Sequence, residues 1–330
     1  MKKGDYHMEI TSVNTIINNA VIATREEFKD DKKIIKGFID AIRLNKELFL
    51  NSNMVDTKNN NGFKIDINVI DRILNKYENM NSVIGDNNVN ELSDDLLKSK
   101  IYDKLGVVLV LFDGNFYTML EMMLLGLYTH NAMIFDYDGY MWGSNTLLIN
   151  IVEAFFKKQG MDEKLFQQSE SLRVNEFFNN NKSIDKTVII GNQEFVDKYI
   201  KECTTEVIVS RYNNYDLYIE DITHKDLIDK ILGLGMNLNL YVRDDIEVDY
   251  DATIVGDVDE AISYINSNGS KNASSIFSSD NDNINRFIKN VKSKRVYLNT
   301  NPSYEDDFDI KQIDLLREKV IIVPNMYDYK

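Results

Sequence analysis

Cysteine, proline and histidine are scarce in this sequence, with one, two and three residues among 330. The single cysteine, Cys203, excludes a disulfide within the chain and is typical of a reducing compartment, so we expect a cytoplasmic protein. The histidines, His7, His130 and His224, share no ligand spacing, and we expect no metal site. No apolar run approaches the ~20 residues that a membrane-spanning helix needs, and the polar N-terminus has no signal-peptide core. The sequence therefore predicts no membrane segment.

Positive charge is also in deficit, because 38 lysines and arginines face 53 aspartates and glutamates. The net charge of -15 makes the average surface repel polyanions, so we expect neither a nucleic acid nor an anionic membrane as a partner. Hydrophobic residues make up 43% of the chain, which is enough for a globular protein of one large or two modest domains.

Apolar runs at 105–112 and 132–135 indicate the fold class. Helical stretches at 117–128 and from residue 144 follow them, and runs this apolar suit parallel strands that helices cover on both faces. Further strands are expected at 188–190, 206–210, 238–242, 275–277, 295–298 and 320–323. Helices are expected at 9–22, 25–50, 67–77, 163–178, 194–201, 225–232, 258–266 and 281–291, and a loop that ends in a short helix at 80–96. The alternation predicts an α/β fold.

Catalytic motifs are absent from the sequence in their common forms. No GxSxG, Walker loop, HExxH or GxGxxG occurs. The adjacent acidic pairs Glu220-Asp221 and Asp244-Asp245 would point apart on a strand, which disfavours a dyad that shares a proton. Cys203 is most simply a packed, inert thiol beside a helix end. The residues alone therefore indicate no catalytic group.

The order of several short segments resembles the aldehyde dehydrogenase superfamily and, within it, γ-glutamyl phosphate reductase, also called glutamate-5-semialdehyde dehydrogenase. The resemblance runs from about residue 30 to about residue 310. Its residues are Leu105-Gly106-Val107, Asn131-Ala132, Ser144-Asn145, Asn237 with Tyr241-Val242, and, late in the chain, Asp259, Glu260, Ala261, Ile262, Ile265, Asn266, Gly269, Ser270, Val296, Tyr297 and Asn299. Each segment is short, and their common order carries the resemblance.

This resemblance implies a Rossmann-like, doubly wound parallel sheet of aldehyde dehydrogenase type, with a truncated catalytic domain. It implies N-terminal helices and a dinucleotide-binding type of α/β domain over residues 1–250. A catalytic remnant over 251–317 and a C-terminal strand for oligomerisation over 318–330 would follow. The family belongs to proline biosynthesis and uses NAD(P), so a dinucleotide and a homodimer are the implied cofactor and assembly.

The first departure from the family pattern concerns the nucleophile. In the family, the catalytic cysteine comes well after the strand that residues 237–242 resemble, but this chain passes from Asp249 almost directly to Thr253 and the next family segment. The cysteine-bearing block is therefore missing, and Cys203 falls in the nucleotide-domain part. Because a thiolate must attack the acyl carbon, the family's thioacyl mechanism cannot run without that residue. The resemblance assigns no catalytic residue.

The second departure concerns the turns that hold the cofactor. By position, the resemblance implies that Asn115, Asp136, Ser144 and Arg211 are the remaining candidates for cofactor contacts. Asp136 stands where the family has a basic residue, and its carboxylate would repel a 2′-phosphate while accepting a hydrogen bond from a ribose hydroxyl. The cofactor is thus unassigned, with NAD compatible and NADP disfavoured.

Three hypotheses on function follow. The first is a catalytically degenerate relative of the family that acts by binding or assembly, with itself or with an active relative. An alternative is an NAD(P)-dependent oxidoreductase that acts on an aldehyde or acyl phosphate with a remodelled site, since hydride transfer needs positioning more than a protein nucleophile. A third is a purely structural, self-associating protein.

Overall fold

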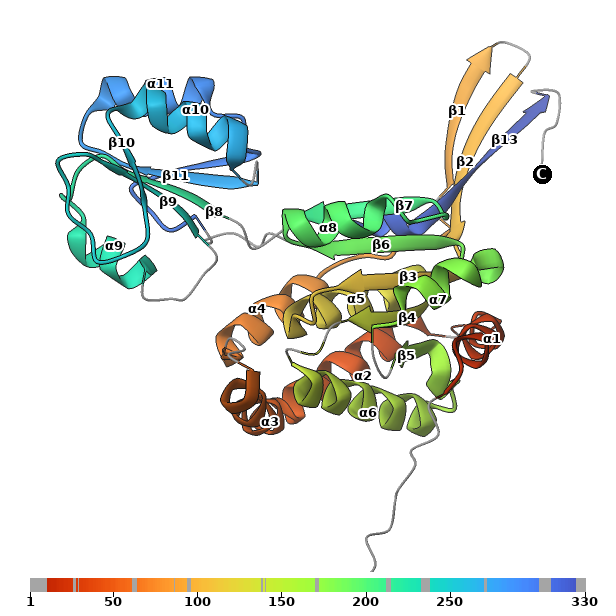
Figure 1. Cartoon of the computed structure of the whole chain (residues 1–330). Helices are drawn as coiled ribbons and strands as arrows, with labels where there is room; N and C mark the ends of the chain where they lie inside the picture. The colour runs from red at the N-terminus through yellow and green to blue at the C-terminus, as the bar shows by residue number, and fades with distance from the viewer. Residues whose placement is uncertain are drawn as a thin grey trace, which may run out of the picture. The chain divides into compact units, whose positions relative to one another are not determined.

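The computed structural model describes most of the chain (Figure 1). The described residues are 11–25, 28, 30–60, 64–85, 87–93, 96–137, 139, 141–169, 172–211, 215–232, 238–269, 272–302 and 310–324. The chain divides into two compact units. The first unit comprises residues 1–189, 199–209 and 310–330, and the second comprises residues 190–198 and 210–309.

Helices open the first unit. They are α1 (Val13–Ala23), α2 (Asp31–Leu44), α3 (Lys46–Asn60) and α4 (Ile67–Glu78). The single helix expected over 25–50 is wrong, because the chain leaves helical geometry at Asn45, with φ −108° and ψ 10°. The Asn45 side chain donates a hydrogen bond to the carbonyl oxygen of Ala41 at 2.8 Å. A short polar side chain that bonds the local backbone favours a helix end, so the apolar stripe continues in a second helix.

A five-stranded sheet follows, which we call the β3 sheet. Its strands are β3 (Val107–Phe112), β4 (Ala132–Tyr137), β5 (Phe166–Gln168), β6 (Lys186–Gly191) and β7 (Val207–Arg211), in the order β5-β4-β3-β6-β7. β3 and β4 pair in parallel, from Val107 opposite Ala132 to Phe112 opposite Tyr137. Every residue of both strands is buried, which explains why the sequence shows them as continuous apolar runs.

Helices connect the strands of the β3 sheet. They are α5 (Phe116–Thr129), α6 (Trp142–Gln159), α7 (Val174–Asn179) and α8 (Gln193–Ile200). The helix expected over 163–178 is wrong: a 3-10 turn (Glu163–Leu165), β5 and α7 occupy this range. Pairing of β5 with β4, with Met133 opposite Phe166, outweighs the helical spacing of the sequence.

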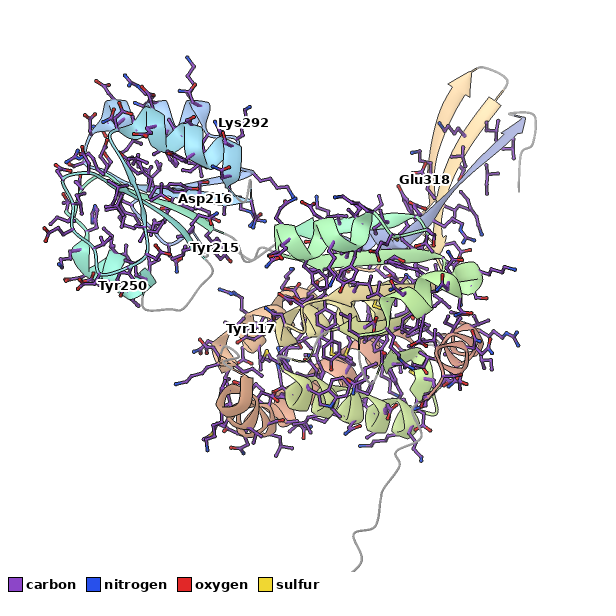
Figure 2. All side chains as sticks on the ribbon, viewed as in Figure 1. Tyr117, Tyr215, Asp216, Tyr250, Lys292 and Glu318 are labelled. Atoms are coloured by element: carbon purple, nitrogen blue, oxygen red, sulfur yellow. The ribbon has the colours of Figure 1, made fainter. Side chains whose placement is uncertain are left out.

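A three-stranded antiparallel sheet, the β13 sheet, also belongs to the first unit (Figure 2). Its strands are β1 (Asn87–Ser93), β2 (Leu96–Lys104) and β13 (Leu316–Pro324), in the order β1-β2-β13. The loop expected over 80–96 is therefore wrong, because a polar segment becomes β1 by pairing with β2. The expected strand at 320–323 is confirmed and is longer. Glu318 on β13 accepts a hydrogen bond from Lys100 Nζ at 3.0 Å across the sheet.

The second unit contains a five-stranded sheet, the β8 sheet. Its strands are β8 (Tyr215–Ile219), β9 (Leu238–Arg243), β10 (Thr253–Val255), β11 (Ala273–Phe277) and β12 (Arg295–Leu298), in the order β10-β9-β8-β11-β12. All of its pairs are parallel. The helix α9 (Lys225–Leu232) packs on one face, and α10 (Val258–Asn268) and α11 (Asn281–Asn290) pack on the other.

The α/β class and the doubly wound parallel sheet expected from the sequence are confirmed. The boundary expected after residue 250 needs correction, because it falls between β9 and β10, which pair within the same sheet. The second unit instead begins its sheet at Tyr215, and β13 returns to the first unit. Local sequence does not reveal this division, because it depends on which strands pair.

Asn131 joins three parts of the first unit. Its fully buried side chain accepts a hydrogen bond from Gly106 N at 2.9 Å and donates to Thr129 Oγ1 at 2.8 Å and to the Leu315 carbonyl oxygen at 2.7 Å.

We expect Asn131→Ala to lower the free energy of unfolding by about 3 kcal/mol in urea denaturation, because buried backbone groups lose their partners. Asn79→Ala, which removes one exposed bond, is the control and should change it by less than about 0.5 kcal/mol. Equal effects would contradict this role.

Candidate functional site

The carboxyl ends of β3 and β4 form the candidate site, because α5 and α6 begin there. Asn115 precedes α5, and its side chain accepts hydrogen bonds from Tyr117 N at 2.9 Å and Thr118 N at 3.4 Å. Asn145, in the first turn of α6, donates to the carbonyl oxygen of Gly114 at 2.8 Å. The two helix starts are therefore joined, and the amides of the first turn of α5 are capped from within the chain.

The start of α6 is closed by a carboxylate from α3. Asp56 accepts hydrogen bonds from Gly143 N at 3.0 Å, Ser144 N at 2.9 Å and Ser144 Oγ at 2.6 Å. Asp56 is nearly buried and Ser144 is fully buried. A helix N-terminus attracts an anion through its free amides and its dipole, and here the chain's own carboxylate takes that place.

Asp136 lies near the end of β4 and is fully buried. Its two carboxylate oxygens accept hydrogen bonds from the Arg173 amide at 3.1 and 3.0 Å. Burial raises the pKa of Asp136 to about 7, against the effect of this hydrogen bond. The Arg173 guanidinium in turn donates to Ser169 Oγ at 3.0 Å and to the Thr11 carbonyl oxygen at 2.7 Å. The Asp136 carboxylate is therefore bonded to the chain's own Arg173 amide.

Asn115, Asp136 and Ser144 lie at one edge of the β3 sheet, and each is held by a partner within the chain. The side chain of Arg211, the fourth candidate, lies outside the described part of the structure, and the residue itself is assigned to the second unit. A dinucleotide phosphate at the start of α6 would meet the Asp56 carboxylate at close range. In this arrangement, Asn115, Asp136 and Ser144 do not fit a dinucleotide phosphate. Their role in cofactor binding stays a prediction.

Sequence reasoning missed Asp56 and Arg173, which contact Ser144 and Asp136. In the structure, α6 starts after Met141, which makes no side-chain cap hydrogen bond, so Asp56 takes the role of a cap from elsewhere in the chain. No local pattern shows which residue provides it. The contact depends on the packing of α3 against α6, and Gly143 permits it, since a Cβ there would lie 2.9 Å from Asp56 Oδ1.

The only cysteine lies far from the family's catalytic position in chain order. Cys203 lies in the first unit between α8 and β7, is partly exposed, and has its Sγ 3.5 Å from Thr205 Oγ1. The second unit contains no cysteine, and β9 is joined to β10 by residues 244–252 alone. No thiol therefore stands in the unit where the family pattern places the nucleophile.

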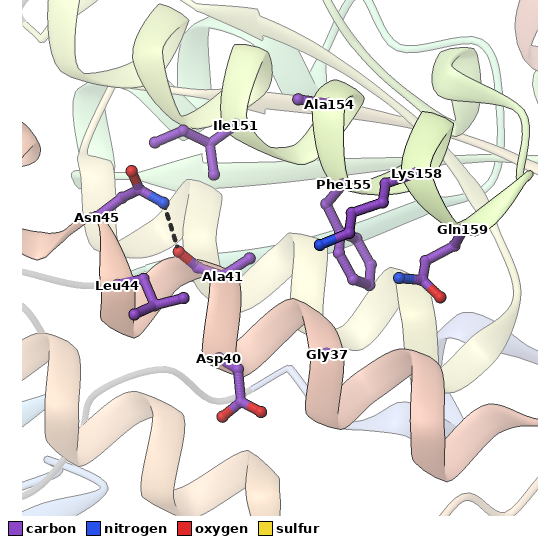
Figure 3. Close-up of a pocket in the computed structure, with 10 residues that line it drawn as sticks. All are labelled: Gly37, Asp40, Ala41, Leu44, Asn45, Ile151, Ala154, Phe155, Lys158 and Gln159. Atoms are coloured by element: carbon purple, nitrogen blue, oxygen red, sulfur yellow. Dashed lines mark hydrogen bonds between the residues drawn. The ribbon is translucent and has the colours of Figure 1, made fainter.

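A pocket of about 460 Å³ lies between α2 and α6 of the first unit (Figure 3). Its lining is Gly37, Asp40, Ala41, Leu44, Asn45, Ile151, Ala154, Phe155, Lys158 and Gln159. The two charged residues, Asp40 and Lys158, are both exposed. Because the pocket presents no buried polar group to orient a ligand, it lacks the specificity element of a small-molecule site.

Two further kinds of feature are absent from the described residues. Within these residues, no group of three or more histidine, cysteine, aspartate or glutamate side chains could hold a metal ion. Across the same residues, no helix has both the length and the apolar character needed to cross a membrane.

The chain is similar to known γ-glutamyl phosphate reductases. It is 21% identical to that of Alkaliphilus oremlandii over 350 residues, with 84% of each chain covered, and 23% identical to that of Brachyspira hyodysenteriae, with 93% of this chain and 85% of the relative covered. No family model matches the sequence.

Solved structures of the aldehyde dehydrogenase superfamily share the fold. The γ-glutamyl phosphate reductase of Thermotoga maritima superposes with a TM-score of 0.66 at 12% identity, covering 97% of this chain and 100% of that one. A lactaldehyde dehydrogenase gives a TM-score of 0.72 at 12% identity, covering 94% and 90%. The predicted resemblance to this superfamily, and to γ-glutamyl phosphate reductase within it, is confirmed.

The buried Asp136 carboxyl leads to a prediction on pH. Its folded-state pKa is about 7 and its ordinary value is 3.8, so the folded state keeps a proton that the unfolded chain loses. Stability from this group is fully present below pH 3.8 and is lost as the pH rises to about 7. Asp136→Asn should therefore gain stability relative to the unsubstituted chain over this range, by up to ~1.4 kcal/mol per pH unit. Denaturant titrations between these pH values measure it.

The control for this prediction is Asp282→Asn, at an exposed position of α11. It should follow the unsubstituted chain at every pH. A constant stability difference between Asp136→Asn and the unsubstituted chain across the range would contradict the assignment.

Proposed function

We propose that this chain is a catalytically degenerate relative of γ-glutamyl phosphate reductase that acts by binding or assembly. The observation that carries the proposal is the Asp56 carboxylate at the start of α6, with three hydrogen bonds to Gly143 and Ser144. An anionic cofactor group would have to displace a nearly buried, hydrogen-bonded carboxylate and would be repelled by it.

The position of the thiol supports the same proposal. Thioacyl chemistry needs a thiolate within reach of the acyl carbon, and the second unit has no cysteine to supply one. Asp136 adds to this argument, because a buried carboxyl that already accepts the Arg173 amide is poorly placed to bind a ribose hydroxyl.

Assembly is supported by the edge that β13 forms among the described strands of the β13 sheet. β13 has nine residues and forms the outer strand of this sheet. Val320, Ile321 and Ile322 are consecutive and 48%, 41% and 55% exposed. An exposed, apolar edge strand is a template for pairing with another chain, so we place self-association at this edge.

Thermal unfolding with added dinucleotides tests the loss of the cofactor. We expect no rise in Tm with millimolar NAD, NADH, NADP or NADPH, because the Asp56 carboxylate occupies the start of α6. A ligand that did bind, at 100 times its Kd, would add roughly 2.7 kcal/mol to the free energy of unfolding and raise Tm by several degrees. The matched variant is Asp56→Ala, which frees the amides at the start of α6 and alone should gain Tm with inorganic phosphate.

Two results would contradict the proposal of a degenerate enzyme. One is a clear Tm shift of the unsubstituted chain with any of the four dinucleotides, which favours the remodelled oxidoreductase. The other is dinucleotide-dependent turnover of glutamate semialdehyde, in the presence of phosphate, by the purified protein.

Light scattering on a sizing column tests the assembly. We expect a mass of at least two chains for the unsubstituted protein and a single chain for Ile322→Lys, because a charge on the edge strand opposes pairing. Leu44→Lys is the control, since Leu44 is 84% exposed on α2 and lies outside the β13 sheet. A monomeric unsubstituted protein, or an Ile322→Lys variant of unchanged mass, would exclude self-association at β13.

A further inference from the structure

The β8 sheet of the second unit has two edge strands, β10 and β12, at opposite ends of its strand order. Within the described residues, neither strand pairs with another strand on its outer side. The edge of a sheet presents a row of backbone amides and carbonyl oxygens that can pair with a strand of another chain. Each edge can therefore accept one more strand.

On β12, the backbone groups of Val296 and Leu298 face outward. Arg295 faces β11, because its amide donates a hydrogen bond to the Asn272 carbonyl oxygen at 3.0 Å. Along a strand, the backbone groups of successive residues point to opposite neighbours. The amides and carbonyl oxygens of Val296 and Leu298 are therefore directed away from β11.

On β10, Ile254 is the residue whose backbone groups face outward. Its neighbour Val255 faces β9, because the Val255 carbonyl oxygen accepts a hydrogen bond from Asp244 N at 3.0 Å. By the same alternation, the Ile254 amide and carbonyl oxygen point away from β9. The side chain of Ile254 is 55% exposed, and that of Leu298 on β12 is 41% exposed. Both edges thus combine outward backbone groups with an exposed apolar side chain.

The segment that precedes β10 is acidic. Residues 244–251 contain five aspartates and glutamates and no lysine or arginine. Asp249 and Asp251 are exposed and lie just before β10, at the amino end of the strand. Neither forms an ion pair with a described residue. Within the described part of the chain, the charge beside this edge is therefore uncompensated.

The segment that precedes β12 is basic, although the whole chain has a net charge of -15. Lys292 and Lys294 are exposed and stand at the amino end of this strand. Figure 2 shows Lys292 and Tyr250, the residue between Asp249 and Asp251, on opposite sides of the unit. The acidic and basic segments are therefore separated within one copy and can meet only between copies.

Parallel pairing of β12 with β10 of a second copy uses the outward backbone groups of both edges. The Ile254 amide would donate to the Val296 carbonyl oxygen of the neighbouring copy. The Ile254 carbonyl oxygen would accept a hydrogen bond from the Leu298 amide. This pattern sets Ile254 opposite Tyr297, in the middle of β12.

The same register brings opposite charges together. Three residues before that pair, Asp251 lies opposite Lys294. Two residues further back, Asp249 lies opposite Lys292. Pairing between two β10 strands is disfavoured, because their antiparallel arrangement would set Asp251 opposite Asp257, and like charges directly opposite are destabilising. The charges therefore favour a contact between two different edges.

We propose that the β8 sheet continues from copy to copy, with β12 of one chain paired in parallel with β10 of the next. This interface is heterologous, so each added copy leaves one edge open, and the copies form an open chain or a ring. Because the strands are short and the contact is small, we expect a Kd on the order of 100 µM. The interface lies within the second unit and does not involve β13, so it goes beyond the function proposed above.

Sedimentation velocity tests this association on the full chain with Ile322→Lys, which removes the contact proposed at β13. We expect the weight-average mass to rise at least twofold between about 10 and 300 µM. Elution from a sizing column dilutes the protein below this range. The two interfaces are therefore measured separately, and failure of one leaves the test of the other intact.

Charge reversal beside either edge should prevent the association. Lys292→Glu with Lys294→Glu places acidic residues beside both edges, and Asp249→Lys with Asp251→Lys places lysines beside both. Each double variant alone should associate at least tenfold more weakly than the parent. An equimolar mixture of the two should regain association, because each acidic edge then meets a basic one.

Two further variants separate charge from backbone pairing. Lys32→Glu with Lys33→Glu changes the net charge as much as the lysine reversal does, at exposed positions of α2, and should associate like the parent. Ile254→Pro removes the outward amide and no charge, and it should prevent association. Circular dichroism verifies the fold of each variant.

Three results would overturn the proposal. One is a mass that stays constant up to about 300 µM, which would leave the two edges to a different protein. Another is association of either charge-reversed variant at the strength of the parent. The third is a mixture of the two reversed variants that remains monomeric. Should Ile254→Pro fail to fold, this mixture still decides.

Discussion

The parallel pairing of β3 with β4 is the interaction on which the first unit depends. Both strands are buried along their whole length, so helices must cover them, and α5 and α6 must start at the same edge of the sheet. Each helix start exposes amides that need acceptors. In a dinucleotide-binding sheet, a phosphate can provide part of that need, whereas Asn115 and Asp56 provide it here. The closure of the edge thus follows from how the chain caps its own helices.

The two units repeat the same topology with different outcomes at the carboxyl edge. The orders β5-β4-β3-β6-β7 and β10-β9-β8-β11-β12 both place the earliest strand at the centre. In the first unit, the carboxylates of Asp56 and Asp136 accept backbone amides. In the second, the side chains of Ser278 and Asn283 donate hydrogen bonds to the Glu220 carboxylate. The buried carboxylates therefore accept backbone amides at the first edge and side-chain donors at the second.

The sequence predicted the helices and strands that have a local signal. It did not predict those that form only because one strand pairs with another. β3 and β4 were visible because fully buried parallel strands are apolar throughout. β1 was missed because its polar residues form a strand only by pairing with β2. At the site, the position of Ser144 at a helix start followed from the sequence. Its partner Asp56 did not, because 88 residues separate them and only the packing of α3 on α6 brings them together.

Asn131 shows how a residue of the family pattern can have a purely structural role. It matches the family pattern, and its hydrogen bonds to Gly106, Thr129 and Leu315 explain this by structure alone. Replacement of such a residue strands buried backbone groups, whereas replacement of a residue at the edge of the sheet alters only what binds there. The chain is 21% identical to the reductase of Alkaliphilus oremlandii, so the fold is shared at low identity. Function must be argued from the site, and at the edge of the β3 sheet the carboxylates of Asp56 and Asp136, which lie outside the matching segments, bond the amides of Ser144 and Arg173.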